Sequence, residues 1–327
     1  MNWVEASAPS NIALIKYMGK VETKLNRPTN SSLSYSLEKL RTFVRLRPDE
    51  SLSEDAWSPY ERSDLLKIEL SEKGLAKFLN YFAMLKKEFK IKGFFRIESA
   101  NNFPADCGLA SSASSFAALT QVAHDYMIST SPGAVSAYSP KELSKLSQKG
   151  SGSSCRSFFT PWALWHQDGA EAMQFSYQNL KHQVILCDQN VKDVSSSEAH
   201  TRVLTSDLFK GRPERAEERL KLLVQALRSE NWKSAYQITW SEFWDMHTLF
   251  HTSVPPFIYM NALSFQILKE LNEYWNIKND GPLITMDAGS NIHLLFRTDQ
   301  KAHYFEMIHR FSSLASMWTD EGYLEKR

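Results

Sequence analysis

Residues 101–119, NNFPADCGLASSASSFAAL, constrain the fold more than any other stretch of this chain. Pro104 has no amide proton and Gly108 tolerates positive φ, so the first part of the stretch is predicted to be a loop. From Leu109 onward, small and apolar residues recur at helical spacing and predict a tightly packed helix. A loop that opens a helix leaves free backbone N–H groups at the positive end of the helix dipole, which is where phosphate binds.

Two interpretations of this stretch remain open on its residues alone. Its serine hydroxyls add donors for phosphate or a ligand for magnesium, and they belong to Ser111, Ser112, Ser114 and Ser115. No Gly-Lys-Ser/Thr follows, so this is not a Walker A loop, and an ordinary loop before a serine-capped helix is the alternative. Residues 94–99 are predicted to form a strand directly before it. Strand, loop and helix in this order are what an anion-binding loop requires, which favours phosphate binding.

Length, charge and cysteine usage narrow the class of protein. A chain of 327 residues is predicted to hold two domains. Its 38 basic and 37 acidic residues give a net charge of +1, which predicts no nucleic-acid partner and no membrane partner. No apolar run approaches the roughly 20 residues that span a bilayer, and the N-terminus lacks a signal-peptide pattern. The three cysteines show no CxxC spacing, which argues against a disulfide framework or zinc site and favours a reduced, cytoplasmic setting.

Predicted helices and strands alternate in both halves, which indicates an α+β protein with two domains, 1–188 and 189–327. The first half holds an amphipathic helix at 75–89 with its lysines on the outer side, and predicted strands at 12–15, 33–37, 42–47, 94–99, 162–167, 172–176 and 183–188. Residues 49–64 are charged and are predicted to form an irregular, mobile excursion. The second half holds a helix N-cap at 193–196, helices at 213–228, 231–250, 261–275 and 300–314, and strands at 283–286, 292–296 and 316–319.

The stretch KGSGSSCRSFF at residues 149–159 is a second candidate site. Gly150 and Gly152 free the backbone, and three serines supply hydroxyls. Arg156 offers a planar fork of donors that suits carboxylate or phosphate. A flexible turn before a helix is the alternative, but small polar residues that end in an arginine favour an anion site.

Two pairs of residues each have two interpretations. Lys16 and Lys20 follow a predicted buried strand, so they are either solvated surface groups or, beside a phosphate loop, anion ligands. His247 and His251 share one helical face, as metal ligands at i and i+4 do. Thr248 stands where the glutamate of an HExxH motif would stand, so structural histidines are favoured over a zinc site.

Seven stretches, taken in order, resemble the diphosphomevalonate decarboxylases of the GHMP kinase superfamily of small-molecule kinases. They are SAPSNIALIKYMGK, KLNRPTNSSLSYSL, NNFPADCGLASSASSFAAL, KGSGSSCRSFF, KDVSSSEAH, FIYMNA and TMDAGSN. The resemblance runs from residue 7 to about residue 296. The PxxxGLxSSA core at 104–113 supports only the superfamily, whereas IKYxGK, GSGSxCRS and DAGxN support the decarboxylase branch.

The resemblance implies a fold and a reaction. The fold is an N-terminal domain with a distorted sheet and the phosphate loop, a ferredoxin-like C-terminal domain, and a cleft for ATP and substrate between them. The reaction is ATP-dependent decarboxylation of mevalonate 5-diphosphate to isopentenyl diphosphate, and the family suggests a homodimer. The alternatives are a phosphomevalonate decarboxylase, a kinase that phosphorylates the 3-hydroxyl without decarboxylation, and a non-catalytic ligand-binding relative.

The resemblance also implies roles for individual residues. Asp287 accepts or orients the proton of the 3-hydroxyl, Lys16 stabilises negative charge beside it, Arg156 holds the substrate carboxylate, and Asn11 orients the arginine or the substrate. The 5-diphosphate is expected to bind at Tyr17, Lys20, Ser151, Gly152 and Ser153. The ATP phosphates are expected at Pro104, Ala105, Cys107, Gly108, Leu109, Ala110, Ser111 and Ser112, with Ser112 as the ligand of Mg²⁺.

Four departures from the family pattern concern substrate preference. Met18 stands where the family usually has Trp, Thr160-Pro161 replaces Gly-Gly, and Ser290 replaces Pro. Asp106 lies in the phosphate loop, where its charge repels phosphate unless it points away or meets a cation. None of the four removes a charged group that the reaction requires.

Overall fold

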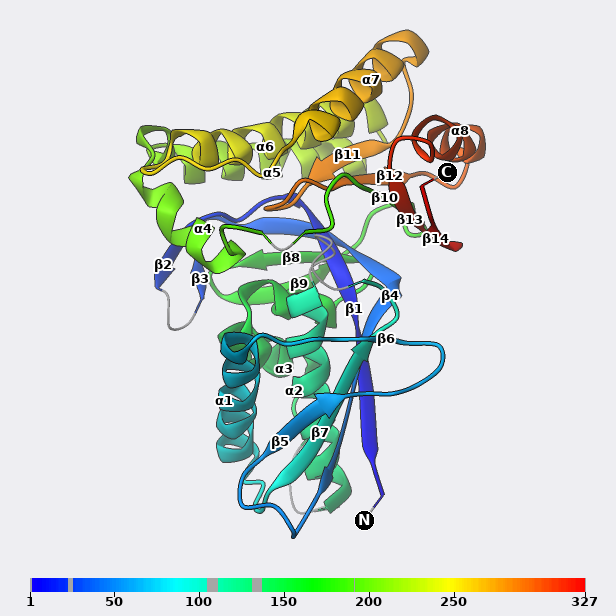
Figure 1. Cartoon of the computed structure of the whole chain (residues 1–327). Coiled ribbons are helices and arrows are strands. Elements are labelled where there is room, and N and C mark those ends of the chain that lie inside the picture. The colour runs from blue at the N-terminus through cyan, green and yellow to red at the C-terminus, as the bar shows by residue number, and fades with distance from the viewer. Residues whose placement is uncertain (1, 23–25, 105–110, 131–136, 191, 327) are drawn as a thin grey trace.

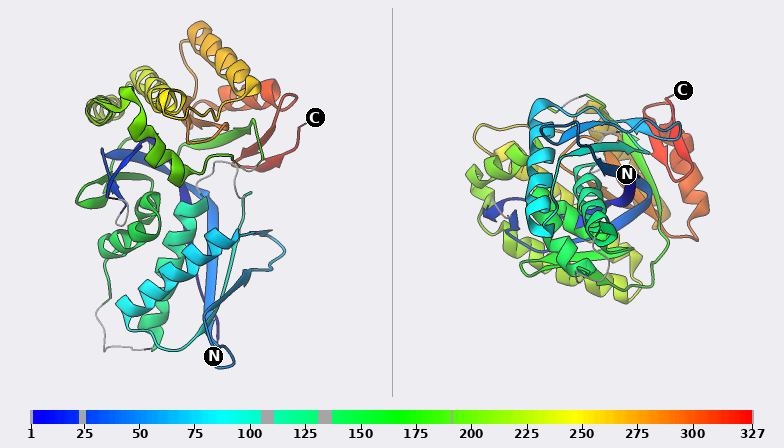
Figure 2. Two further views of the ribbon diagram at one scale, coloured as in Figure 1. Left: turned by 60° about the vertical axis from the view of Figure 1, so that its left-hand side comes forward. Right: turned by 90° about the horizontal axis from the view of Figure 1, so that it is seen from below.

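A computed structural model describes residues 2–22, 26–104, 111–130, 137–190 and 192–326 of the chain. Two sheets lie one above the other along its length, the N-terminal one below and the C-terminal one above in Figure 1. The same division is visible from the side in Figure 2. Within the described residues, no helix combines the length and the apolar character that crossing a membrane demands.

The N-terminal sheet has seven strands and is organised around β4 (Ser32–Pro48). The strand β1 (Val4–Ile15) pairs antiparallel along β4, with a register shift between Pro9 and Ser10. β4 is a single long strand, where the alternation in the sequence predicted two, and it pairs with different partners along its length. The other strands are β5 (Ala56–Pro59), β6 (Leu66–Lys67), β7 (Phe95–Asn101), β8 (Trp162–His166) and β9 (Gly169–Met173).

Helices α1 (Glu72–Phe89), α2 (Ser111–Thr130) and α3 (Pro140–Gly150) pack beside this sheet (Figure 1). The central α2 is buried on most sides because alanine and serine allow close approach, as its small and apolar residues predicted. Its core partners include Phe82 of α1 and Ile97 of β7. A short 3-10 helix, η1 (Gly152–Phe158), follows α3 and carries the second candidate site.

The C-terminal sheet is antiparallel and has the order β11-β12-β10-β13-β14. Its strands are β10 (Lys181–Leu186), β11 (Leu283–Met286), β12 (Ile292–Phe296), β13 (Ser316–Thr319) and β14 (Gly322–Leu324). Its helices are α4 (Ser196–Arg202), α5 (Arg212–Arg228), α6 (Trp232–Thr252), α7 (Ala262–Lys278) and α8 (Lys301–Phe311). Two further 3-10 turns, η2 (Val203–Thr205) and η3 (Asp207–Phe209), follow α4, and β2 (Lys20–Glu22) pairs with β3 (Arg27–Pro28). This is the two-domain α+β fold that the resemblance implied.

One hydrophobic core runs through both domains. Ile12 and Leu14 of β1 belong to the same buried cluster as Ile284 of β11 and Phe243 of α6. The Thr285 hydroxyl donates to the backbone carbonyl of Ala13 across the junction. The end of β1 is therefore held rigidly against the C-terminal domain, and the residues that follow β1 enter the space between the domains.

Two predicted features were wrong because their partners are distant in sequence. Residues 49–64 are not irregular throughout, since β5 within them pairs parallel with β7, and Asp55 binds Lys86 and the Phe95 N–H. The strand at 183–188 does not finish the first domain, since β10 pairs with β12 and β13. We therefore propose that the division between the domains lies between β9 and β10 and not at residue 188.

Three smaller differences concern local structure. β9 spans Gly169–Met173, three residues earlier than the predicted strand at 172–176. The helix α3 was not predicted, although Pro140 and a capping box between Ser139 and Glu142 mark its start. The short strand β14 after β13 was also not predicted.

Candidate active site

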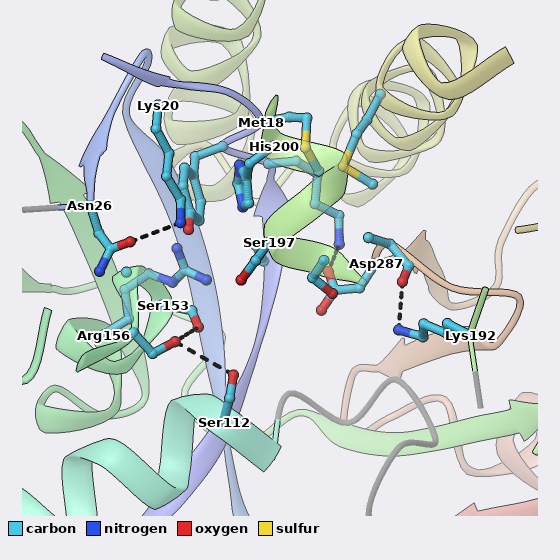
Figure 3. A pocket seen from close by; sticks show the side chains of 18 of the residues that line it. Met18, Lys20, Asn26, Ser112, Ser153, Arg156, Lys192, Ser197, His200 and Asp287 are labelled. Atoms are coloured by element: carbon cyan, nitrogen blue, oxygen red, sulfur yellow. Dashed lines mark hydrogen bonds and ion pairs between the residues drawn. The ribbon is translucent and has the colours of Figure 1, made fainter. Parts of the chain in front are cut away.

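A cavity between the domains brings together residues from widely separated segments of the chain (Figure 3). The segment that follows β1 contributes Lys16, Tyr17, Met18 and, at the start of β2, Lys20 to its lining, and the start of α2 contributes Ser112. η1 and the residue before it contribute Ser151, Gly152, Ser153 and Arg156. Further lining residues are Asn26, Lys77 of α1, Lys192, His200 of α4, and Asp287 with Ala288 after β11. Cations dominate this lining, so the cavity suits an anionic ligand.

Lys16 and Asp287 form an ion pair across the domain junction. The Lys16 Nζ lies 2.5 Å from Asp287 Oδ1, with the lysine side chain 3% exposed and the aspartate 28% exposed. Burial lowers the pKa of Lys16, although Asp287 opposes that change. Burial raises the pKa of Asp287, but the Lys16 ammonium, with His293 and Arg156, outweighs burial and leaves that pKa below its usual value. A carboxylate that stays ionised therefore faces the cavity.

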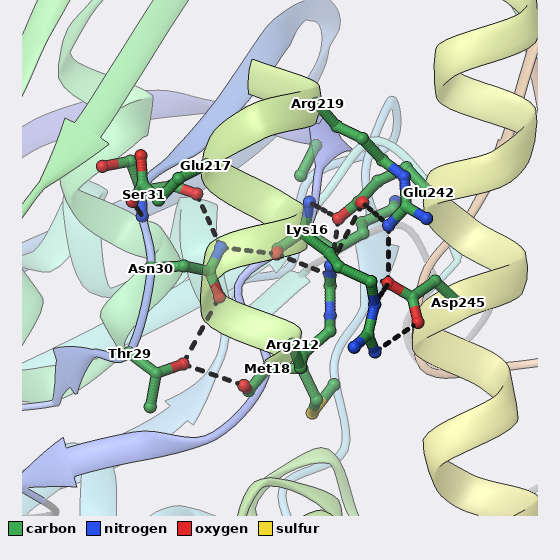
Figure 4. Close-up of polar contacts among 12 residues, drawn as sticks. Lys16, Met18, Thr29, Asn30, Ser31, Arg212, Glu217, Arg219, Glu242 and Asp245 are labelled. Atoms are coloured by element: carbon green, nitrogen blue, oxygen red, sulfur yellow. Dashed lines mark hydrogen bonds and ion pairs between the residues drawn. The ribbon is translucent and has the colours of Figure 1, made fainter. Parts of the chain in front are cut away.

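The backbone of Lys16 is held by a buried ion pair from the C-terminal domain (Figure 4). The Lys16 N–H donates to Glu242 Oε1 at 3.0 Å, and Arg212 Nη2 donates to the Lys16 carbonyl at 3.1 Å. Arg212 and Glu242 bind each other at 2.5 Å, and both side chains are fully buried. Asn30 donates to the same carbonyl at 3.0 Å. These contacts fix the point from which the lysine side chain extends toward Asp287.

Replacing Glu242 by Ala is expected to lower the free energy of unfolding by about 3–5 kcal/mol, because Arg212 would stay buried without its main counter-charge. Urea unfolding followed by circular dichroism measures this loss. Glu218→Ala is the matched control in α5, since that side chain is 64% exposed, and its expected effect is within about 0.5 kcal/mol. A loss no larger in Glu242→Ala than in the control would refute a stabilising role for the pair.

The turn that carries Asp287 is held from two sides. His247 Nε2 donates to the Asp287 carbonyl at 3.0 Å, and Lys192 Nζ donates to the Ala288 carbonyl at 2.5 Å. His247 is fully buried and acts as a structural histidine, in agreement with the interpretation favoured by its sequence context. His251 lies further along α6 and is half-buried. Among the described residues, no group of three or more His, Cys, Asp or Glu is placed to hold a metal ion.

Arg156 and Asn11 lie in direct contact. Arg156 Nε donates to Asn11 Oδ1 at 3.1 Å, and its Nη1 donates to the Ser32 hydroxyl at 2.8 Å. Asn11 is held in turn, because its Nδ2 donates to the Ser157 hydroxyl at 2.9 Å. Arg156 is 4% exposed, and burial lowers its pKa. A buried guanidinium that is held in one orientation binds most strongly to an anion that presents two oxygens.

Tyr17, Lys20, Ser151, Gly152 and Ser153 share one part of the cavity. The three hydroxyls of Ser112, Ser151 and Ser153 form a chain, with oxygen separations of 3.4 and 3.3 Å. A Cβ on Gly152 would lie 2.6 Å from the Tyr17 hydroxyl, so only glycine permits this approach. Lys20 Nζ donates to Asn26 Oδ1 at 2.8 Å, and burial, aided by Lys77, lowers the pKa of Lys20 to about 8.

The predicted phosphate loop is described only at its ends. Pro104 is half-buried at one end, and Ser111 and Ser112 begin α2 at the other. The predictions for Ala105, Cys107, Gly108, Leu109 and Ala110, and the concern about Asp106, lie outside the described residues. Lys77, Ser112 and Lys192 line both the first cavity and a second one between α1 and α2. The two cavities are therefore adjacent, with α2 beginning between them.

Several lining residues were not assigned a role from the sequence. Lys77 was placed on the outer side of its helix, although it lines the cavity. Lys192 and His200 lie in the stretch KDVSSSEAH, whose match was the available signal. Arg212 and Glu242, which hold the backbone of Lys16, were also not predicted, because a buried ion pair between two helices leaves no pattern in the sequence.

Comparisons with known proteins agree along the whole chain. Residues 8–178 match a family model described as the diphosphomevalonate decarboxylase-like N-terminal domain, and residues 183–325 match the mevalonate 5-diphosphate decarboxylase C-terminal domain. The diphosphomevalonate decarboxylase of Debaryomyces hansenii is 32% identical over 96% of this chain and 84% of its own length. A mevalonate diphosphate decarboxylase from Legionella pneumophila has a TM-score of 0.87 at 43% identity, over 94% of this chain and 97% of its own. MDDEF in complex with MVAPP, AMPPCP and magnesium has a TM-score of 0.82 at 30% identity, over 95% of this chain and 92% of its own.

Proposed function

The chain belongs to the diphosphomevalonate decarboxylase family, and on that basis we propose that the cavity between its domains is the active site. The family resemblance drawn from the seven stretches is confirmed. The enzyme catalyses ATP-dependent decarboxylation of mevalonate 5-diphosphate to isopentenyl diphosphate in isoprenoid biosynthesis. The observation that carries the assignment of the site is the Lys16–Asp287 pair, which faces the same cavity as Arg156.

Asp287 is the proposed base for the 3-hydroxyl. Its Oδ1 accepts from Lys16, so the other carboxylate oxygen remains to accept the hydroxyl proton as the oxygen attacks the γ-phosphorus of ATP. The Lys16 ammonium is placed to stabilise negative charge on the phosphate that then leaves the tertiary carbon. As the C–O bond breaks, the electrons of the bond to the carboxylate carbon form the new double bond, and carbon dioxide is released.

Arg156 is proposed to hold the substrate carboxylate until that step. Departure of the phosphate builds positive charge on the tertiary carbon, and a nearby water would capture that carbon. Met18, Met246 and Ala288 supply apolar surface to the cavity, which limits water near the reacting atoms. Met18 is 3% exposed, so it forms a packed wall at the position where the family usually has Trp.

The 5-diphosphate is proposed to bind at Tyr17, Lys20, Ser151, Gly152 and Ser153. Lys20 gives this part of the site a pH dependence, because its pKa is lowered to about 8 in the free enzyme and a bound anion raises it. A group whose pKa rises on binding contributes affinity below its free pKa and loses that contribution as pH rises through it.

We therefore expect the KM for mevalonate 5-diphosphate to stay nearly constant up to about pH 7.5 and to rise by up to about tenfold per unit above pH 8. Steady-state kinetics across this range measure the effect. Lys20→Arg keeps the charge at all these pH values, so the rise should disappear in that variant. The same rise in both proteins would assign the pH dependence to another group.

ATP and Mg²⁺ are proposed to bind where the cavity meets the start of α2. The serine hydroxyls there fit a magnesium ion that is held mainly by phosphate oxygens and water, as Mg²⁺ usually is. Ser112 is the proposed protein ligand, because it lines both adjacent cavities. When bound, the ion supplies positive charge to the transferring phosphoryl group. The loop positions 105 and 107–110 remain predictions for the phosphates.

A coupled assay of ADP and carbon dioxide tests the function. The purified enzyme with ATP and Mg²⁺ should release both products in equal amounts from mevalonate 5-diphosphate, and little of either from mevalonate 5-phosphate or mevalonate. ADP without carbon dioxide would indicate a 3-kinase, and a preference for the monophosphate would indicate a phosphomevalonate decarboxylase. Binding without either product would indicate a non-catalytic relative.

A homodimer and a cytoplasmic location are also proposed. The homodimer follows from the family resemblance, and light scattering coupled to size-exclusion chromatography tests it by molar mass. The cytoplasmic location follows from the cysteine usage, and cell fractionation tests it. Cys155 and Cys187, both of which the structure describes, are buried and unpaired, which fits a reducing setting.

A further inference from the structure

We propose that His200 is a binding residue for the diphosphate group, to which its Nε2–H donates a hydrogen bond. The proposal rests on the proposed function of the cavity and adds an imidazole donor to Lys20 and the neutral groups already assigned to the diphosphate. The stretch KDVSSSEAH marked this region as part of the family pattern but gave His200 no role of its own.

The position of His200 places its ring on the diphosphate side of the cavity. The residue lies in α4, is 8% exposed, and lines the cavity with Lys20, Asn26 and Ser153 (Figure 3). Its ring stacks on Tyr17, with 4.5 Å between centroids and 29° between planes. Tyr17 and Lys20 are both proposed diphosphate ligands, so His200 is next to the atoms that would recognise the ligand.

The contact with Gly19 decides which ring nitrogen carries the proton. The Gly19 N–H donates to His200 Nδ1 at 3.1 Å, so Nδ1 is the unprotonated nitrogen. Burial, aided by the charge of Lys20, lowers the pKa of His200 to about 3, so the ring is neutral at physiological pH. A neutral imidazole with an accepting Nδ1 has its proton on Nε2. Among the described residues, Nε2 has no hydrogen-bond partner, and the ring lines the cavity.

The backbone around Gly19 explains why the donor is held in place. Gly19 has a φ of +92°, and a Cβ there would lie 2.6 Å from the Phe209 ring, so only glycine fits this turn. The turn aims its N–H at Nδ1, which fixes the imidazole with Nε2 on the opposite side of the ring. A neutral donor also satisfies a phosphate oxygen without placing a further desolvated charge beside Lys20.

Three substitutions separate the donor from the other contacts of the ring. His200→Asn places an amide oxygen where Nδ1 accepts from Gly19 but has no group that reaches the Nε2 position. His200→Gln places an amide donor near the Nε2 position. His200→Phe keeps the ring stacking and loses both nitrogens. His309→Asn, on the exposed face of α8, is the matched control.

We expect the KM for mevalonate 5-diphosphate to rise about tenfold or more in His200→Asn and His200→Phe, the size of one hydrogen bond to a charged group. The KM for ATP should stay unchanged, and kcat should change much less than the first KM. His200→Gln should recover most of the affinity. An unchanged KM in His200→Asn, or equal losses in His200→Gln and His200→Phe, would overturn the proposal.

Two further measurements, neither of which depends on turnover, keep this test separate from the test of the reaction. Nitrogen-15 NMR of the imidazole should show the Nε2–H tautomer with no titration between about pH 5 and 8. Inorganic pyrophosphate, titrated by calorimetry, should bind more weakly to His200→Asn than to wild type and His309→Asn. An Nδ1–H tautomer, or equal pyrophosphate affinity in all three proteins, would refute the role of His200 even if decarboxylation is observed. A wild-type enzyme that binds pyrophosphate but releases no carbon dioxide would refute only the proposed reaction.

Discussion

Replacing Asp287 by Asn should lower kcat for decarboxylation by about 10²-fold or more while leaving the binding of mevalonate 5-diphosphate nearly intact. The amide has almost the shape of the carboxylate but cannot accept the hydroxyl proton. It also leaves the Lys16 ammonium, 3% exposed, without its counter-charge, so the pKa of Lys16 should fall further. Carbon dioxide release measures the chemical step, and calorimetric titration with substrate measures binding.

Asp168→Asn is the matched control for this experiment. The Asp168 side chain is 91% exposed in the turn between β8 and β9, and it does not line the active-site cavity. Its turnover should equal that of the wild type. Asp287→Ala should lose turnover as Asp287→Asn does. Near-normal turnover in either Asp287 variant would reject this residue as the base.

Replacing Arg156 by Lys should lower kcat/KM for mevalonate 5-diphosphate by about 10²-fold or more, even though the positive charge is kept. The arginine is held by two hydrogen bonds, from Nε to Asn11 and from Nη1 to Ser32, which aim the planar group at the cavity. A lysine has one ammonium, so it cannot keep both contacts and also present a fork to a carboxylate. Because the carboxylate would lose its anchor, carbon dioxide formation should fall with substrate affinity.

Initial rates at varied substrate concentration measure this effect. Arg310→Lys in α8 is the matched control, since that side chain is 40% exposed and its ion pair is with Glu306 of its own helix. Asn11→Ala should give a smaller loss in the same direction, because it removes only one of the two contacts that orient the arginine. A wild-type rate in Arg156→Lys would count against its assigned role.

Local sequence patterns predicted much of the fold. The apolar run at 12–15, the amphipathic helix at 75–89 and the small-residue helix after the loop are all present, because each is set by residues close together in the chain. The two misses that changed the fold description share one cause. β5 forms only because β7 offers it an edge, and β10 joins the second sheet because β12 and β13 pair with it. Strand pairing between distant segments leaves no periodic signal in either segment.

The amino-acid sequence alone established the family and the reactive side chains that the chain carries. Ordered motifs identified the family and named the lysine, arginine and aspartate proposed to act in the reaction, because those side chains are local features of short stretches. Their arrangement in space depends on the packing of the two domains, which the sequence does not show. Lys16 and Asp287 are 271 residues apart and lie 2.5 Å apart because the end of β1 packs against the C-terminal domain.

The buried Arg212–Glu242 pair and the Gly19–His200 hydrogen bond belong to the same class of features. Each depends on the exact distance between elements from different parts of the chain, and that distance is set by the packing of whole sheets and helices. A linear pattern records which side chains are present and which face of an element they occupy. It does not record a proton position, or an ion pair that forms only after distant elements of the chain have packed.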